Sequence, residues 1–267
     1  MMKINNDFKG NLVSIVTYNN SAIIGKVISS IIENTKNVDY KIVVFDNAST
    51  DDTIDKVKSL KSDRVEIISS KVNYGFGYGH NRNAESYPNA LNYIIYNPDL
   101  FLTDNLIHDY SSKLIQNEKI GMLLPKVEYP NGNLQYLCKR NPTFFDLFMR
   151  RFLKKISLKF LKERQKYYEM RDKNYNTSFS IEYASGCCMF IRGSLYREIG
   201  GFDEKFFMYL EDADITRRIN KTHCSVYEPS NRVLHIWNKG AHHSTKLMWI
   251  NIKSAIYYFR KWGWDLY

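Results

Sequence analysis

Apolar residues follow two different spacings along the first half of the chain. Short, almost unbroken apolar runs are typical of buried strands, and they lie at residues 12–17, 41–45, 65–68 and 93–96. Helical spacing after the first run predicts a helix, capped by Ser21, whose apolar face is Ile24, Val27, Ile28 and Ile31. A second helix with Ile54 and Val57 is expected to begin at Ser49 or Asp51. Strands that alternate with helices predict βαβ units around a parallel sheet.

The second half has a different pattern. Residues 127–136 predict a hairpin around Pro130-Asn131-Gly132, and residues 181–191 predict one long strand with Gly186 at its centre. Two short strands, at residues 226–227 and 233–235, and an aromatic-rich helix over residues 245–261 complete the expected elements. Because no stretch rich in Gly, Ser or Pro divides the chain, we expect a single domain over residues 1–267.

Polar residues follow three of the predicted strands at the point where each ends. They occupy residues 17–19, 46–47 and 97–99. In parallel sheets of this kind, ligands bind beyond the carboxyl ends of the strands. The sequence therefore predicts that these three clusters meet in one site.

An acidic block, FMYLEDADITRRI, lies where an apolar run passes into a predicted helix. Asp214 faces Arg217 and Arg218 at helical spacing, so it is expected to be neutralised by them. Glu211 and Asp212 fall in the first turn, where unpaired backbone N–H groups favour anions. A carboxylate beside buried aromatic residues is a candidate general base, although for this block taken alone a capping cluster on an ordinary helix is the safer interpretation.

The chain carries a formal net charge of +10 at pH 7, much of it between residues 150 and 173. Basic and apolar residues are interleaved there at helical intervals, which predicts a basic amphipathic helix within residues 144–173. Such a helix suits an anionic membrane surface, and a packed helix with a solvated basic face explains the same pattern. The basic residues lie apart from the polar strand ends and no nucleic-acid-binding motif occurs, so no nucleic-acid partner is expected.

Several features point to the cytoplasm, with peripheral attachment at the inner face of the membrane as an option. The opening residues do not resemble a signal peptide, and no apolar stretch approaches the length of a transmembrane helix. The cysteines have no metal-binding spacing and are expected to be buried thiols in a reducing compartment: Cys138, Cys187, Cys188 and Cys224.

Six motifs together carry a family resemblance. In chain order they are VSIVTYNN, VVFDNASTDDT, NYGFGYGHNRN, YNPD, GGFDEKFFMYLEDADITRRI and VLHIW. Each motif is weak alone, but the ordered set, over roughly residues 12–235, resembles the family 2 inverting glycosyltransferases of the GT-A fold. The NPD form and the FMYLEDAD block further resemble bacterial rhamnosyltransferases that build O-antigens and capsules.

The resemblance implies an α/β, Rossmann-like fold with a mostly parallel central sheet flanked by helices. Residues 1–125 would bind a nucleotide sugar, and residues 126–267 would bind the acceptor. The implied reaction moves L-rhamnose from dTDP-rhamnose to a hydroxyl of a glycan or a polyprenyl-linked oligosaccharide. A UDP-hexose or UDP-galactofuranose donor fits the same strand ends. A non-catalytic protein that binds nucleotides, sugars or nucleic acid is the alternative from another class.

The resemblance also implies a divalent cation, Mg²⁺ or Mn²⁺, that stabilises the leaving diphosphate. In the family an Asp-x-Asp holds the metal, and this chain has Asn97-Pro98-Asp99 in that place, so only Asp99 supplies a carboxylate. His235 matches a histidine that contributes to the metal in some relatives, and His242 or His243 could substitute for it.

Further site residues follow from the resemblance. Asp46 matches a carboxylate that hydrogen-bonds the pyrimidine or its ribose, and Asn81 or Arg82 would face the diphosphate. The full set expected to bind the nucleotide sugar is Thr17, Tyr18, Asn19, Asp46, Asn47, Asn73, Gly75, Gly77, Asn81 and Asn97. Asp212 would be the general base, with its pKa raised by burial beside Phe207 and Tyr209. Glu211 would orient the acceptor.

Overall fold

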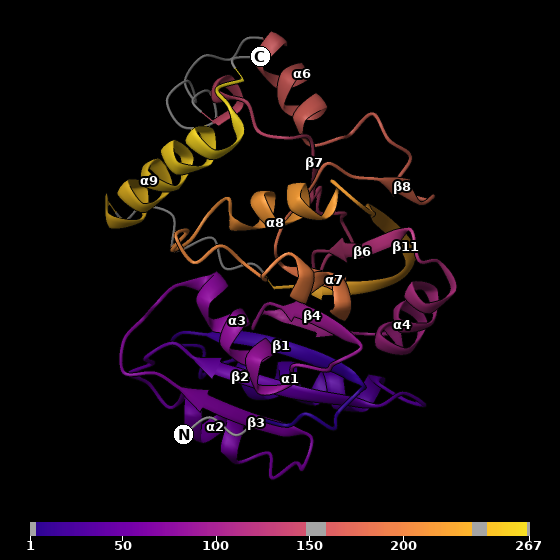
Figure 1. Ribbon diagram of the computed structural model, residues 1–267, viewed down its shortest axis with the longest axis vertical. Coiled ribbons are helices and arrows are strands. Elements are labelled where there is room, and N and C mark those ends of the chain that lie inside the picture. The colour runs from indigo at the N-terminus through magenta and orange to yellow at the C-terminus, as the bar shows by residue number, and fades with distance from the viewer. Residues whose placement is uncertain (1–3, 148–158, 237–244, 266–267) are drawn as a thin grey trace.

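The computed structural model describes residues 4–147, 159–236 and 245–265, and a mixed sheet forms its centre (Figure 1). Four parallel strands make up one half of the sheet: β3 (Val65–Ser69), β2 (Tyr40–Asp46), β1 (Asn11–Thr17) and β4 (Asn92–Tyr96). Beyond β4 the order continues with β10 (Cys188–Arg192), β6 (Ile120–Glu128), β11 (Cys224–His235) and β5 (Leu100–Leu102). In this half β6 and β11 are parallel, whereas β10 and β5 run antiparallel to their neighbours.

Two short pairings flank the main sheet. The strand β8 (Phe179–Ser180) pairs with β11, and a separate two-stranded sheet joins β7 (Cys138–Lys139) to β9 (Tyr183–Ala184). The second sheet matters for the site, because it brings the segment after β6 next to the segment that precedes β10.

Helices cover both faces of the sheet, which explains why all residues of β1 are buried and why most of its residues are apolar on both faces. Val13 and Ile15 share a core with α1 (Ile24–Asn34) and α4 (Leu106–Gln116), and α2 (Thr53–Lys58) lies against α1. Leu12 faces the opposite core, formed with α3 (Phe76–Ser86), α7 (Gly193–Glu198) and α8 (Glu211–Ile219).

A third core lies at the end of the molecule that holds α6 (Lys159–Tyr168) and α9 (Thr245–Trp262) (Figure 1). Its buried residues come from α6, β9, the loop before α8, α8 and α9: Tyr168, Tyr183, Phe206, Leu210, Ala213, Tyr258 and Phe259. This packing attaches α9 to the side of α8 that faces away from the sheet.

The strands predicted in the first half are confirmed to within one residue at each end. The first helix has the predicted buried face, but Ser21 is not its cap, since the N-cap is Ile23 and no side chain caps the helix. The second helix begins at Thr53 rather than at Ser49 or Asp51. The physical reason is that the Asp51 carboxylate accepts the Thr53 backbone N–H, at 3.1 Å, in a turn that precedes the helix.

The elements predicted for the second half of the chain differ more from the structure. Residues 181–191 are not one strand: they form β9 and β10 in two different sheets, with a turn at residues 185–187 between them. The two short strands predicted at residues 226–227 and 233–235 are one strand, β11, with an irregularity between Glu228 and Arg232. The predicted hairpin is present as a turn closed by a bridge between Glu128 and Leu134.

Other expectations have mixed outcomes. Of the basic segment, residues 148–158 lie outside the described part of the chain, and α6 accounts for the portion from Lys159 to Tyr168. Cys224 is exposed, contrary to the expected burial, whereas the other three cysteines are buried. Within the described ranges, no helix combines the length and hydropathy needed to cross a bilayer.

Candidate active site

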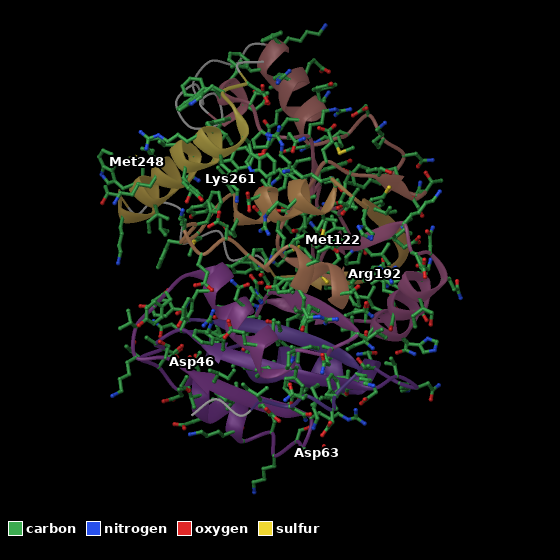
Figure 2. The ribbon with its side chains drawn as sticks, in the orientation of Figure 1. Asp46, Asp63, Met122, Arg192, Met248 and Lys261 are labelled. Atoms are coloured by element: carbon green, nitrogen blue, oxygen red, sulfur yellow. The ribbon has the colours of Figure 1, made fainter. Side chains whose placement is uncertain are left out.

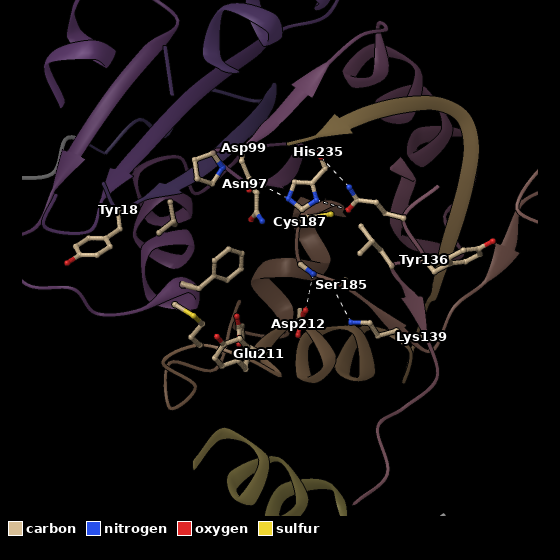
Figure 3. Close-up of a pocket in the computed structure, with 18 of the residues that line it drawn as sticks. Tyr18, Asn97, Asp99, Tyr136, Lys139, Ser185, Cys187, Glu211, Asp212 and His235 are labelled. Carbon is tan, nitrogen blue, oxygen red and sulfur yellow. Dashed lines mark hydrogen bonds and ion pairs between the residues drawn. The ribbon is translucent and has the colours of Figure 1, made fainter. Parts of the chain in front are cut away.

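A cavity of about 910 Å³ opens beyond the carboxyl ends of β1 and β4, as the strand ends predict (Figure 3). One wall comes from the ends of β1 and β4, a second from α8 and the loop before it, and a third from residues 129–139 and 165–171. Ten of the residues that the sequence indicated line it: Thr17, Tyr18, Asn47, Asn73, Gly75, Asn97, Asp99, Glu211, Asp212 and His235. The tertiary fold therefore collects most of the predicted set in one cavity.

Asn47 organises the wall near β1. Its Nδ2 donates to the Gly75 carbonyl at 3.0 Å, and its Oδ1 accepts the Tyr74 N–H at 2.8 Å. Gly75 has a φ of 95°, and a Cβ there would lie 2.1 Å from the Phe207 carbonyl oxygen, so only glycine fits. These contacts fix the start of α3 against the loop that leads into α8.

Four predicted nucleotide-binding residues do not line the cavity. The Asn81 side chain is used within the fold, because it donates to the Phe202 carbonyl at 2.9 Å and accepts the Tyr196 hydroxyl at 2.8 Å. Gly77 allows close packing on Phe202, and Asn19 accepts the Thr50 N–H at 2.8 Å, which joins the loop after β1 to the loop after β2. Arg82, the alternative to Asn81, pairs with Glu85 and Glu204.

Asp46, the fourth of these residues, lies at the end of β2 (Figure 2). Its carboxylate is buried: Oδ2 accepts the Ser49 N–H at 3.1 Å, and Oδ1 has no hydrogen-bond partner among the described residues. An unsatisfied buried oxygen is costly, so this atom is suited to accept a donor from a ligand or a water.

Asp99 and His235 meet at the back of the cavity (Figure 3). The pairing of β5 with β11 brings them together, and His235 Nε2 lies 3.2 Å from Asp99 Oδ1. His235 Nδ1 is 2.8 Å from Gln135 Oε1, which sets the orientation of the ring. Asn97 Oδ1 is buried and makes no hydrogen bond within the described part of the chain, and Asp99 Oδ1 makes none besides its close approach to His235.

These donors fit a hard divalent cation, although they do not form a complete cage. No group of three or more His, Cys, Asp or Glu side chains that could hold a metal occurs among the described residues. Mg²⁺ is commonly bound by one or two carboxylates together with substrate phosphates, so Asp99 could hold it when a diphosphate supplies further oxygens. The imidazole of His235 would suit Mn²⁺ better than Mg²⁺. His242 and His243 lie outside the described residues.

The loop before α8 makes a sharp turn. Tyr209 and Leu210 have φ values of 73° and 66°, in the left-handed region that residues other than glycine rarely adopt. Each costs about 1–2 kcal/mol, and the surrounding packing must hold them there. The turn starts α8 at Glu211, so that the first two residues of the helix face the cavity.

Three donors hold the Asp212 carboxylate. Its Oδ1 accepts the Tyr183 hydroxyl at 3.1 Å and the Ala213 N–H at 2.9 Å, while its Oδ2 accepts the Gly186 N–H at 2.9 Å. Lys139 points toward Ser185 beside this carboxylate, with Nζ 3.4 Å from Ser185 Oγ and 4.7 Å from the centre of the Tyr183 ring (Figure 3). Sequence reasoning missed Tyr183 and Lys139, because neither lies in a motif and both reach the site only through the β7–β9 pairing.

Glu211 is the more buried of the two carboxyl groups at the start of α8. Burial raises the pKa of Glu211 well above its usual range, and the neighbouring Asp212 raises it further. The sequence had assigned the effect of burial to Asp212. The backbone turn explains the difference, since it directs the Glu211 side chain inward and leaves Asp212 half-buried against the 185–186 segment.

Asp214 is a structural residue, as predicted. Its fully buried carboxylate accepts the Arg218 Nε at 2.9 Å and the Trp262 Nε1 at 2.8 Å, and Lys261 Nζ lies 2.7 Å away. Lys261 lies between α9 and α8 in Figure 2. Arg217 does not pair with Asp214; its guanidinium stacks over the Trp262 ring at 4.7 Å.

Residues 12–200 match the model of the family described as glycosyl transferase family 2. The chain belongs to this family. The chain is similar to an N-acetylglucosaminyl-diphospho-decaprenol L-rhamnosyltransferase of Mycobacterium tuberculosis, 26% identical over 73% of this chain and 66% of that protein. This chain thus spans just under two thirds of that relative. The rhamnosyltransferase WbbL of Escherichia coli is 24% identical over 88% of this chain and 84% of its own length.

Solved structures establish that this family 2 chain has the GT-A fold. GalNAc-T7 with UDP, GalNAc and Mn²⁺ superposes with a TM-score of 0.71 and 16% identity, covering 97% of this chain and 49% of that one. A mannosyltransferase of Pyrobaculum calidifontis with GDP-Man and Mn²⁺ gives 0.59 at 16% identity, covering 91% and 62%. TarS of S. aureus with UDP-GlcNAc gives 0.61 at 16% identity, covering 89% and 61%.

Proposed function

We propose that this glycosyltransferase moves L-rhamnose from dTDP-rhamnose to a hydroxyl of a lipid-linked saccharide, with inversion at the anomeric carbon. One observation carries the proposal: a single cavity has Asp99 and His235 on one wall and Asp212 on another. A metal-stabilised leaving group and a general base must act on the same sugar from different sides. The activities by which the bacterial relatives are named favour rhamnose as the sugar.

The donor would lie along the ends of β1, β2 and β4. Thr17, Tyr18 and Asn47 border the space for the nucleotide, and the buried Asp46 oxygen is available at the end of β2. Asp99 and His235 would hold Mg²⁺ or Mn²⁺, and a cation there neutralises the charge that develops on the diphosphate as it leaves. Solved relatives of the same fold contain UDP or GDP-Man, so UDP-sugars belong in any donor screen.

Asp212 would act as the general base. Its carboxylate is held by three hydrogen bonds, so it is ordered before the substrates bind, and its position at the start of α8 favours the anionic form. It takes the proton from the acceptor hydroxyl as the oxygen attacks the anomeric carbon. Attack from the side opposite the diphosphate inverts that centre.

The acceptor would lie along residues 129–139 and 165–171, and we propose a diphospho-polyprenol saccharide like the one in the name of the mycobacterial relative. Such an acceptor belongs to the synthesis of O-antigens or capsules at the cytoplasmic face of the membrane. Two helices at one end of the molecule suit an anionic bilayer. In α6 Phe160 is 62% exposed among lysines, and in α9 Trp249 is 58% exposed between Lys246 and Lys253.

The enzymatic proposal is tested by release of nucleoside diphosphate. The wild-type protein is incubated with dTDP-rhamnose, UDP-glucose or UDP-galactofuranose, with Mg²⁺ or Mn²⁺, and with or without a synthetic diphospho-lipid saccharide. We expect transfer from dTDP-rhamnose that requires the cation. Asp212→Asn should abolish transfer while the donor affinity, measured by calorimetry, stays unchanged. Unchanged turnover in that variant would contradict the role of Asp212, and no release from any donor would favour a non-catalytic binding protein.

Membrane attachment is tested separately by sedimentation with vesicles. Vesicles that contain an anionic phospholipid should carry the protein down at low salt and release it at high salt, because surface attraction between charges is screened. Neutral vesicles are the control. Failure to sediment with anionic vesicles at low salt would indicate that the basic residues of α6 and α9 face solvent and do not bind a membrane.

A further inference from the structure

Two neighbouring carboxyl groups line the cavity in opposite circumstances. Asp212 accepts three hydrogen bonds. Glu211 is only 5% exposed, and its Oε2 has no hydrogen-bond partner among the described residues. Glu211 lines the cavity, and a buried carboxyl oxygen without a partner is costly unless a ligand or a water bonds to it.

The charged groups around Glu211 determine whether its carboxyl group is neutral or ionised. Among the described residues, the titratable groups that interact with it are Asp212 and Tyr183, and neither is a cation. Two carboxylates that share one site do not both ionise readily, and the group with the donors takes the charge. Burial, with a further contribution from Asp212, raises the pKa of Glu211 well above its usual range, and the opposing effect of its own backbone N–H is smaller.

We propose that Glu211 is a neutral carboxylic acid whose Oε2–H donates a hydrogen bond to a sugar hydroxyl bound beside Asp212. The two carboxyl groups then divide the work: Asp212 accepts the proton of the attacking hydroxyl, while Glu211 keeps its proton and fixes a sugar. With Glu211 protonated and Asp212 ionised, two negative charges do not lie side by side at the start of α8. This inference rests on the proposed transferase function, and its ligand is a hydroxyl oxygen of either the donor or the acceptor sugar.

Three substitutions test the form of Glu211. Glu211→Gln keeps the size and a hydrogen-bond donor, so its kcat/KM should fall clearly less than that of Glu211→Met. Glu211→Met keeps the volume and loses the donor, so kcat/KM should fall about tenfold. Asp212→Asn is the matched control for a carboxyl-to-amide change, and it should lose about 10²–10⁴-fold. In Glu211→Met, a raised KM for the donor or for the acceptor identifies which sugar the acid holds.

The acid limb of the pH–rate profile gives a second measurement. If Glu211 is neutral, Glu211→Gln removes no charge and the limb stays in place. If Glu211 is ionised, the substitution removes a negative neighbour, Asp212 ionises more readily, and the limb moves to lower pH. A moved limb, or a Glu211→Gln variant as inactive as Asp212→Asn at unchanged melting temperature, would overturn the proposal.

A third measurement does not depend on turnover. With ¹³C-labelled glutamate carboxyl groups, the resonance that disappears in Glu211→Gln should have the shift of a protonated acid at pH 7 in the wild type. A resonance that titrates like those of exposed glutamates would refute the neutral form. Absence of nucleotide-sugar turnover in the wild type would instead count against the proposed function, so the two failures are told apart.

Discussion

Gly186→Ala is the sharpest test of how the general base is positioned. A Cβ at residue 186 would lie 3.1 Å from the Cβ of Asp212, whereas carbon atoms in contact prefer about 3.5–4.0 Å. The two atoms must therefore separate by about half an ångström. Gly186 is not among the glycines with positive φ, so alanine accepts its backbone conformation and the close contact is the main perturbation.

The expected result is kinetic. Displacement by about 1 Å can cost about 10²-fold in rate, so half of that should lower kcat about tenfold. Release of nucleoside diphosphate at saturating substrates measures kcat, and thermal unfolding measures the stability. Gly25→Ala in α1 is the matched control, because its Cβ meets its nearest neighbour, the Lys56 carbonyl oxygen, only at 4.0 Å. That change should leave kcat unaltered and stabilise the helix by up to about 1 kcal/mol. A Gly186→Ala variant within twofold of the wild type would refute the reasoning that the 185–186 segment positions Asp212.

Three further predictions concern other parts of the site. Asp214→Ala removes a fully buried carboxylate that pairs with the partly buried side chains of Arg218 and Lys261, and it should lower the free energy of unfolding by about 3 kcal/mol in urea. Asp55→Ala, at an exposed carboxylate, should cost under about 0.5 kcal/mol. Similar losses in both variants would contradict the role of Asp214 in joining α8 to α9. Because the pKa of Glu211 is raised, the native state keeps a proton that the unfolded state releases above about pH 4.3. The free energy of unfolding of the wild type should therefore fall with rising pH by about 1.4 kcal/mol per pH unit more than that of Glu211→Gln. Parallel curves of stability against pH for the two proteins would contradict a raised pKa at Glu211. Lys139 Nζ lies beside Ser185 in the half of the cavity proposed for the acceptor. Lys139→Gln should therefore raise KM about tenfold for an acceptor that carries a diphosphate and leave KM for a neutral glycoside unchanged. Equal effects on both acceptors would count against a contact between Lys139 and the diphosphate charge.

Sequence periodicity predicted the first half of the fold well because each element there is specified locally. A continuous apolar run is what a strand covered on both faces requires, and the spacing of Ile24, Val27, Ile28 and Ile31 corresponds to the buried face of α1. The predictions failed where a contact distant in sequence decided the local structure. Residues 181–191 read as one strand, but the approach of α8 at Gly186 divides them between two sheets.

The candidate site likewise contains residues that local sequence patterns predict and residues whose roles depend on distant contacts. Asp99, Asp212 and the polar strand ends could be found from the sequence, because parallel topology places strand ends on one edge and an acidic pair at a helix start is a local pattern. Asn81 lies within an equally suggestive motif, yet its amide is used to hold the 202–204 loop. No local pattern distinguishes a residue that lines a cavity from one that supports its wall.

The amino-acid sequence by itself thus determined the order of the elements, the edge of the sheet that carries the site and the family resemblance, since all three depend on residue type and spacing along the chain. The tertiary structure alone decided that Tyr183 and Gly186 hold Asp212 and that Lys139 stands beside it. It also decided that Glu211 is more deeply buried than Asp212. Burial and hydrogen-bond partners depend on which distant segments meet, and two left-handed residues before α8 fix that meeting in this protein.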